Sequence, residues 1–166
     1  VAVRWDWARH SGQPETTGVS PINFTAIFNE TAYNFIGLDV TLSGTAVTPG
    51  TTIATVTGGP TTYNVAVSNM TSHGTVIASI GAGVATDAAG NPNTASTSTD
   101  NTVTFDSVAP IASINLQASS DSGISSADNI TNAASLVFDV SFDKAVTGLD
   151  ELDFSNIGTA AGCSFS

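Results

Sequence analysis

Basic residues are almost missing from this sequence. Arg4, Arg9 and Lys144 stand against fourteen Asp and Glu residues, so the net charge is −11. Nucleic-acid binding depends on Lys and Arg side chains that displace counterions from phosphates, and attraction to anionic membrane surfaces depends on them too. The composition therefore argues against nucleic-acid and membrane-surface partners. It suits an extracellular protein that meets divalent cations.

Cysteine and long apolar runs are scarce as well. Cys163 is the only cysteine, so no disulfide can form within the chain. A run of about 18 apolar residues, which a transmembrane helix requires, is missing, and we expect no membrane insertion in this segment. The sequence shows neither an initiator Met nor a signal-peptide pattern, and we expect it to be a piece of a longer protein.

What the sequence does have is apolar material in short alternating runs. Hydrophobic residues make up 41% of the chain and mean hydropathy is +0.19, which is enough for a packed core. Helical periodicity is nearly absent, and alternating segments are separated by Gly, Pro, Asn and Ser, as in an all-β sandwich. We predict about seven strands in the first part of the chain, the number in an immunoglobulin (Ig)-type sandwich. They lie near residues 1–5, 22–28, 39–42, 52–56, 63–67, 76–80 and 103–105.

An internal repeat is the most informative feature. Phe24 and Phe28 recur 114 positions later as Phe138 and Phe142. The same offset, held without gaps, matches Thr17 with Thr131, Leu38 with Leu152, Asp39 with Asp153 and residues 44–46 with 158–160. The alternating stripe Ile22, Phe24, Ala26, Phe28 becomes Leu136, Phe138, Val140, Phe142. Because both identities and alternation persist, we interpret the chain as two units built on one plan.

The repeat predicts the domain boundaries. The first unit covers residues 1–108 and the second covers 109–166, with Pro110 stiffening the link between them. The second unit lacks counterparts of residues 53–106 and is expected to be the first half of a sandwich. Half a sandwich leaves strand edges open. Either the chain continues, which is the simpler interpretation, or strands from another molecule complete the unit.

Several stretches carry a family resemblance. They are residues 20–25, 39–46, 62–67, 74–76, 86–92 and 98–103 in the first unit and 120–131 in the second. Together they resemble the Ig-like tandem repeat domains of large bacterial extracellular and surface adhesin-type proteins. Residues 4–10 and 29–33 depart from the usual pattern of these repeats. The resemblance implies an all-β fold of Ig-like β-sandwich repeats with the second unit incomplete, and a location at the bacterial cell surface.

Acidic and amide side chains form two groups with the ligand chemistry of calcium. The candidate ligands are Asp87, Asn91, Asp100 and Asp106 in the first unit, and Asp121 and Asp128 in the second. Ca²⁺ takes six to eight oxygen ligands from such side chains and from backbone carbonyls. If the sandwiches join end to end, both groups would converge where the units meet. Related adhesin repeats use calcium at their junctions, so the resemblance supports the same expectation. The spacing is not that of an EF-hand, and the alternative is that these residues only form turns.

Aromatic and histidine side chains have simpler explanations than a binding or catalytic site. Trp5, Trp7, Tyr33 and Phe35 would make a sugar-binding platform if exposed, but packing inside the protein is favoured. His10 and His73 lie far apart, without a nucleophile motif beside either, and are read as surface residues.

Three further motifs are also read as structural. Of the acidic residues Asp150, Glu151 and Asp153, the last repeats Asp39 and indicates a turn at a strand entry rather than a glycosidase acid. Cys163 is expected in the core of the second unit. The Asn-x-Ser/Thr sequons at Asn23, Asn29, Asn69 and Asn129 are explained by the high Thr content.

The sequence thus predicts a non-catalytic extender of a secreted bacterial surface protein, with neighbouring Ig-like repeats as partners and calcium as a candidate ion. A cell-surface or glycan target would lie elsewhere in the parent protein. Three alternatives stay open: a filament subunit completed by a neighbour's strand, a carbohydrate- or protein-binding module at the Trp5/Trp7 edge, and an accessory domain of a secreted enzyme.

Overall fold

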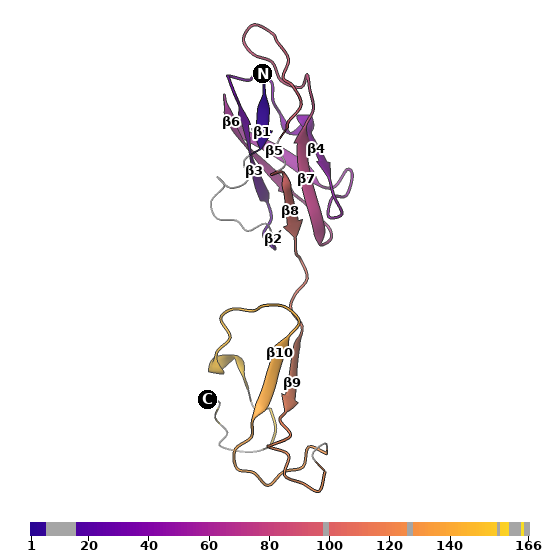
Figure 1. Ribbon diagram of the computed structural model, residues 1–166, viewed down its shortest axis with the longest axis vertical. Helices are drawn as coiled ribbons and strands as arrows, with labels where there is room; N and C mark the ends of the chain where they lie inside the picture. Colours follow the sequence, from indigo (N-terminus) through magenta and orange to yellow (C-terminus); the bar gives the residue numbers. More distant parts are fainter. Residues whose placement is uncertain (6–15, 98–99, 126–127, 156, 160–163, 165–166) are drawn as a thin grey trace. The chain divides into compact units, whose positions relative to one another are not determined.

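A computed structural model shows an all-β chain of two separate units. It describes residues 1–5, 16–97, 100–125, 128–155, 157–159 and 164. Unit 1 is Val1–Val108 and unit 2 is Ala109–Ser166 (Figure 1). No described residue belongs to an α-helix, and the regular elements are strands and two short 3₁₀ helices. None of the helices in the described part of the chain is long and apolar enough to cross a membrane.

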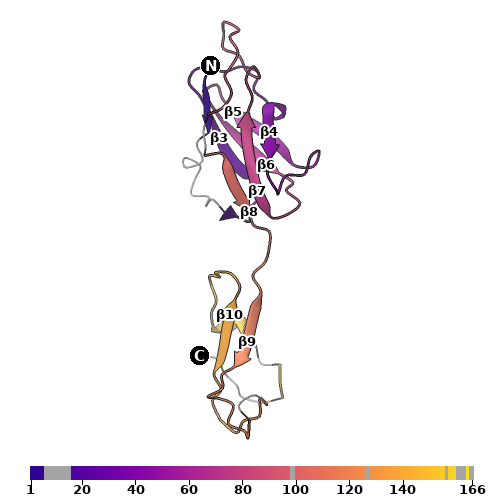
Figure 2. The ribbon, with the colours of Figure 1, turned by 45° about the vertical axis from the view of Figure 1, so that its right-hand side comes forward.

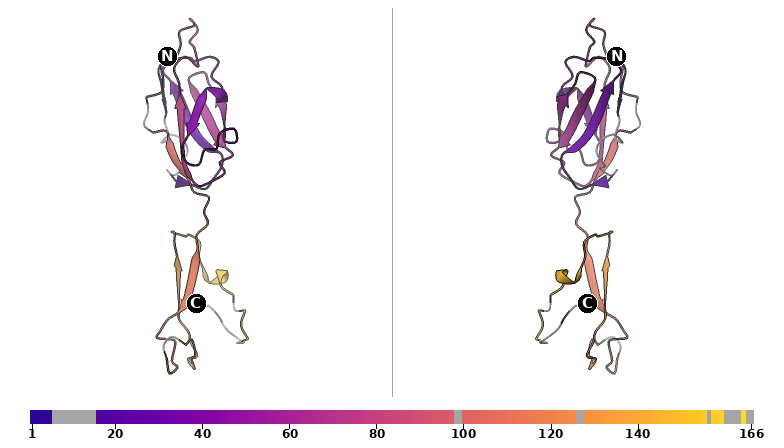
Figure 3. Two further views of the ribbon diagram at one scale, coloured as in Figure 1. Left: turned by 90° about the vertical axis from the view of Figure 1, so that its right-hand side faces the viewer. Right: turned by 90° about the vertical axis from the view of Figure 1, so that its left-hand side faces the viewer.

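Two four-stranded sheets build unit 1. One sheet has the order β1-β3-β6-β5, made of β1 (Val3–Trp5), β3 (Ile22–Phe28), β6 (Thr62–Ser68) and β5 (Ile53–Gly58). The other has the order β2-β8-β7-β4, made of β2 (Thr16–Thr17), β8 (Thr102–Phe105), β7 (Gly74–Ile80) and β4 (Val40–Ser43). All pairs are antiparallel except β2 with β8, which run parallel. Side views show the sheets as separate layers (Figures 2 and 3).

The core of unit 1 lies between these sheets because apolar residues alternate along each strand. One sheet contributes the predicted stripe of β3 together with Tyr63, Val65 and Val67 of β6. The facing sheet contributes alternate residues of β7 and β8, and all of them join one buried cluster. The rings of Phe28, Phe35 and Tyr63 meet edge to face at 5.2–5.7 Å between centroids, a favourable geometry for aromatic pairs.

A 3₁₀ helix, η1 (Gly37–Asp39), leads into β4. Its Asp39 carboxylate accepts a hydrogen bond from the Ile36 amide at 2.8 Å and closes the turn. A Cβ at position 37 would lie 2.1 Å from the Ala54 carbonyl oxygen, so β5 packs against η1 at a distance that only glycine permits.

The described residues of unit 2 form a single two-stranded antiparallel sheet. It consists of β9 (Ala112–Leu116) and β10 (Phe138–Phe142), followed by the 3₁₀ helix η2 (Glu151–Asp153). Most of their residues are exposed or half-buried, and no described strand covers either face. Among the described residues, the strands of unit 2 therefore have no second layer like that of unit 1.

The repeat found in the sequence is also present in the three-dimensional structure. β10 matches the second part of β3, and η2 matches η1, both at the offset of 114. The Asp150 amide donates to Asp153 Oδ2 at 2.9 Å, as the Ile36 amide does to Asp39. At the strand ends, the Ala2 amide donates to Asn29 Oδ1 and the Ile111 amide donates to Asp143 Oδ1, each at 2.7 Å. The two units thus share strand pairing, turn and capping contacts.

The expected all-β fold is confirmed, and all seven expected strands of unit 1 are present. Sequence analysis missed β2, a strand of two residues that follows a segment outside the described residues. A strand this short carries no alternation to detect, and only its pairing with β8 defines it.

Candidate functional site

Asp87 and Asn91 lie together in the loop of residues 81–94, which follows β7. The Asp87 carboxylate accepts hydrogen bonds at 2.8 Å from the amides of Ala89 and Asn91, and at 2.7 Å from the Asn91 side-chain Nδ2. The Asp87 amide in turn donates to the Asn91 carbonyl. These bonds make a closed turn on the surface, which is the structural role left open for these residues.

The same contacts shift the titration of Asp87. Hydrogen bonds from the Asn91 side chain, and then from the amides of Asn91 and Ala89, hold the pKa of Asp87 below its ordinary value. Donors that point at a carboxylate favour its charged form. The Asp87 carboxylate therefore stays charged to a lower pH than that of an ordinary aspartate.

Asp106 lies at the opposite end of unit 1 from this turn. It follows β8, and its Oδ1 accepts a hydrogen bond from the Val108 amide at 3.0 Å. Phe105 pairs with Gly74, the first residue of β7, whereas the loop of residues 81–94 follows the last. The length of β7, about 20 Å, thus separates them (Figure 1). Asp100 is exposed and lies just before β8.

The four candidate ligands in unit 1 therefore do not form one group. The sequence-based expectation was that they meet Asp121 and Asp128 where the units join, and that convergence stays a prediction. Within residues 87–106 the chain passes from one end of the unit to the other. Asp87 and Asn91 come together, and Asp106 does not join them.

In unit 2, Asp121 and Asp128 lie in one loop before β10. Asp121 is 8% exposed; its Oδ2 accepts from the Asn129 amide, and its Oδ1 is buried without a hydrogen-bond partner. Asp128 Oδ1 accepts from the Ile130 amide and packs close to Gly123, where a Cβ would lie 3.1 Å away. Hydroxyl and amide oxygens of Ser122, Thr131 and Asn132 are bonded to one another nearby in the loop.

Asp121 is the one candidate ligand with a buried side-chain oxygen that lacks a hydrogen-bond partner. A buried carboxylate oxygen without a partner is costly, and a cation would offset that cost. Ca²⁺ would take Asp121 Oδ1 together with carbonyl, hydroxyl and water oxygens. Within the described part of the chain, three or more His, Cys, Asp or Glu side chains do not cluster closely enough to hold a metal ion by themselves.

Of the aromatic candidates, Phe35 belongs to the core, and Tyr33 is about half exposed. Phe35 is 6% exposed, so it is not part of a sugar platform and follows the favoured packing interpretation. Trp7, His10 and Cys163 lie outside the described residues.

The acidic residues near the end of unit 2 belong to the capping of η2. The Asp150 carboxylate accepts from the Leu152 amide at 2.8 Å, and Asp153 accepts from the Asp150 amide. The turn that the repeat of Asp39 indicated is thus present, although no described strand follows η2 as β4 follows η1.

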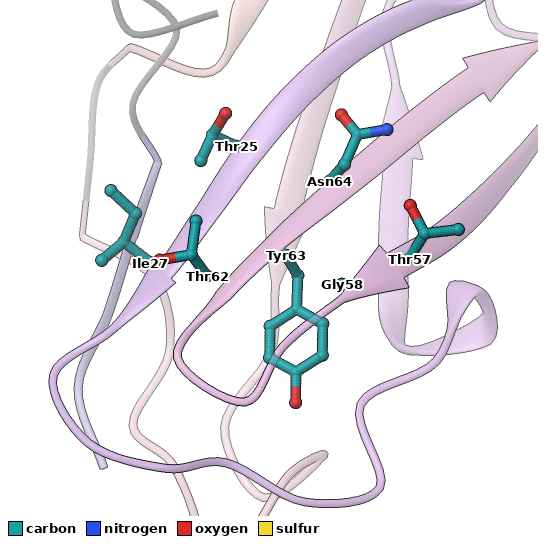
Figure 4. A pocket seen from close by; sticks show the side chains of 7 residues that line it. All are labelled: Thr25, Ile27, Thr57, Gly58, Thr62, Tyr63 and Asn64. Carbon is teal, nitrogen blue, oxygen red and sulfur yellow. The ribbon is translucent and has the colours of Figure 1, made fainter.

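A shallow depression on the outer face of the β3-β6-β5 sheet has a volume of about 430 Å³. Thr25, Asn64 and Thr57 come from three neighbouring strands and line it side by side (Figure 4). Its one ionisable group is the Tyr63 phenol, which donates to the Ala32 carbonyl at 2.7 Å and whose pKa is raised by burial. The depression can offer hydrogen bonds, but its seven lining residues hold no acid–base pair.

Sequence analysis missed Asn93, the residue that fixes the loop of residues 81–94. Asn93 is buried, and its side chain makes four hydrogen bonds, accepting from the amides of Val84 and Ala85 and donating to the carbonyls of Gly81 and Thr94. One signal was available: an Asn between Pro92 and Thr94 in a turn-rich stretch.

Comparison with known proteins gives no match: no family model, no curated protein and no solved structure is similar to this chain.

Proposed function

We propose that this chain is a stalk segment of a secreted bacterial surface protein, made of tandem Ig-like sandwich repeats and without catalytic activity. Neighbouring repeats of the same chain are its partners. The observation that carries the proposal is the structural repeat. The apolar stripe and the capped turn recur at the offset of 114, and each stripe pairs with the strand before it (β1 with β3, β9 with β10). A molecule that repeats its framework serves length and stiffness.

The strand order of unit 1 supports the Ig-like assignment. Taken in chain order, β1, β3, β4, β5, β6, β7 and β8 correspond to strands A to G of an Ig sandwich. The sheet β1-β3-β6-β5 then has the ABED order, and β4, β7 and β8 have the CFG order of the facing sheet. The added β2 extends this second sheet beside β8.

The same framework supports the proposal that unit 2 begins a second sandwich. β10 stands in the place of β3, and η2 in the place of η1, which precedes the third strand of the plan. Counterparts of β5 to β8 would close its core.

Calcium enters the proposal through Asp121. The ion would be held by the loop between β9 and β10, where Asp121 and Asp128 lie, and there it would fix the connection between these two strands. The buried, unpartnered Oδ1 of Asp121 is the observation that supports it.

The stalk proposal is tested by pulling unit 1 along its length. The N-terminus and the end of β8 lie at opposite ends of unit 1 (Figure 1). Force between Val1 and Val108 therefore loads the hydrogen bonds of β1 with β3, and of β8 with β7 and β2, in shear. Bonds in shear break together, so we expect a single high-force unfolding event in force spectroscopy.

The control uses handles at His73, introduced as His73→Cys, and at Val108. These two positions flank the paired ends of β7 and β8, because Gly74 lies opposite Phe105, so force opens the strands one bond at a time. Unfolding forces as low along the whole unit as in this unzipping geometry would contradict a load-bearing role.

A further inference from the structure

The outer edge of β10 has no strand beside it among the described residues. In an antiparallel ladder the amides of successive residues point to opposite edges. The Asp143 amide donates to the Ile111 carbonyl on the β9 side, just as the Asn29 amide donates to the Ala2 carbonyl in unit 1. The amides of Phe138, Val140 and Phe142 therefore belong to the open edge.

An exposed apolar face accompanies this open edge. Phe138 is 47% exposed and Ile114 is 58% exposed, whereas Phe24, the counterpart of Phe138, is 1% exposed. Exposed apolar surface next to unpaired strand bonds is a template for an added strand.

Unit 1 shows which element covers the equivalent edge. There β6 pairs with β3 so that Phe24 faces Val65, Ala26 faces Tyr63 and Ile22 faces Val67. The Phe28 amide donates to the Thr61 carbonyl at 2.8 Å across the same boundary. Shifted by 114 positions, this register places two valines opposite Leu136 and Phe138 and a tyrosine opposite Val140.

The charge of β10 restricts which residues the added strand can carry. Asp139 is the counterpart of Thr25, which faces Asn64, and it carries the only formal charge on β10. A like charge directly opposite would be repelled, and a hydrogen-bond donor or cation would be attracted. The strand that fits here has a neutral or basic residue at the Asn64 position.

Of the contacts around β3 and η1 in unit 1, only the pairing of β3 with β6 serves as a template for unit 2. Gly37, which lets the β5 carbonyl approach η1, is replaced by Glu151 in η2. A strand placed like β5 would meet the Glu151 side chain, so the inference concerns the β10 edge alone.

We propose that the β10 edge binds an extended polypeptide strand of the β6 type. The strand runs antiparallel to β10, carries apolar side chains at alternate positions and has a neutral or basic residue opposite Asp139. This is strand addition at an open sheet edge, in which main-chain bonds give affinity and alternate side chains give specificity. It rests on the repeat relation that supports the proposed function, but it does not depend on the stalk role.

The test uses the whole chain and a labelled synthetic peptide with the sequence of residues 61–69. Saturable binding is expected by fluorescence anisotropy. Amide exchange measured by NMR should slow at Phe138, Val140 and Phe142 and stay unchanged within unit 1. A peptide with Asn64→Lys should bind more tightly than one with Asn64→Asp.

Two matched controls test the contribution of the apolar side chains separately from that of the main-chain hydrogen bonds. A peptide in which the residues equivalent to Tyr63, Val65 and Val67 are all Ser leaves the protein untouched and should lose at least about tenfold in affinity. In the protein, Phe138→Ser should weaken binding similarly, whereas Ser141→Ala on the opposite face of β10 should retain it.

Equal binding of the all-Ser peptide, or slowed exchange only in unit 1, would overturn the proposal. A dimer of the chain that excludes the peptide would assign the edge to a second copy and overturn it too. The pulling experiment on unit 1 is independent of all these outcomes, so the strand proposal and the stalk proposal can fail separately.

Discussion

The two units carry the same local structure in opposite surroundings. β3 and β10 have the same alternating stripe, and η1 and η2 have the same capping bonds. Yet Phe24 is buried in the core of unit 1, and Phe138 is about half exposed. The difference teaches that short-range contacts build strands and turns, whereas burial depends on the strands that arrive later in the chain.

Two buried polar side chains, one in a loop of each unit, also differ. In unit 1, every hydrogen-bonding group of the Asn93 side chain has a partner. In unit 2, Asp121 is buried with one carboxylate oxygen unpartnered. Unit 1 is complete in its polar contacts at this loop, while the Asp121 loop has capacity for one more partner.

The largest effect is expected from a matched pair of substitutions at equivalent phenylalanines, Phe24 in unit 1 and Phe138 in unit 2. Phe24→Ala should cost about 3–5 kcal/mol of the stability of unit 1, because it leaves a cavity in a closed core. Phe138→Ala should cost at most about 1 kcal/mol, since the side chain is already in contact with water. Hydrogen exchange of peptides covering residues 22–28 and 138–142 measures both effects. Equal loosening of β3 and β10 would show that Phe138 is buried in solution.

Calcium should stabilise unit 2 through Asp121. At a concentration one hundred times the dissociation constant, the gain is about 2.7 kcal/mol, seen as a higher melting temperature than in EDTA. Asp121→Asn should abolish this response, and Asp87→Asn in unit 1 should leave it intact. If Asp121→Asn responds to calcium as the wild-type chain does, the site lies elsewhere.

The capping turns should respond equally in the two units. Asp39→Ala and Asp153→Ala each remove one side-chain acceptor, and each should cost about 1 kcal/mol of local stability. Faster exchange of the Ile36 and Asp150 amides is the measurement. Asp128→Ala serves as the control, because it removes an acceptor that caps neither turn. A large effect in one unit alone would break the equivalence of the two turns.

The smallest effect concerns pH and is confined to unit 1. Because the folded state lowers the pKa of Asp87 below its ordinary value of 3.8, its stabilising contribution is present above that value and is lost as pH falls through the folded pKa. Exchange of the Ala89 and Asn91 amides, corrected for intrinsic rates, should therefore speed up in that acid range. Asp87→Asn should remove this pH dependence, and its persistence would assign the titration to another group.

Much of the fold could be predicted because its signals are local. Alternation in residues 22–28, 63–67 and 76–80 places apolar side chains on one side of a strand wherever that strand lies. The match of Asp39 with Asp153 identified a turn that both units form. The two-residue strand β2 could not be predicted, since its only definition is its pairing with β8.

The candidate site was less predictable for a geometric reason. Asp87 and Asp106 are near in sequence, but Asp87 lies in the loop after β7, and the chain then returns along β7 through β8 before it reaches Asp106 at the other end. The role of Asn93 depends on four backbone groups that only the folded loop brings to it.

The sequence by itself determined the all-β class, the alternating stripes and the repeat at 114 positions, because each depends on residues close together in the chain or on direct comparison of two segments. Only the tertiary structure decided which stripe is buried, which candidate ligands meet and which carboxylate oxygen lacks a partner. These depend on packing between distant segments, and that packing follows from how far strands extend and where loops return.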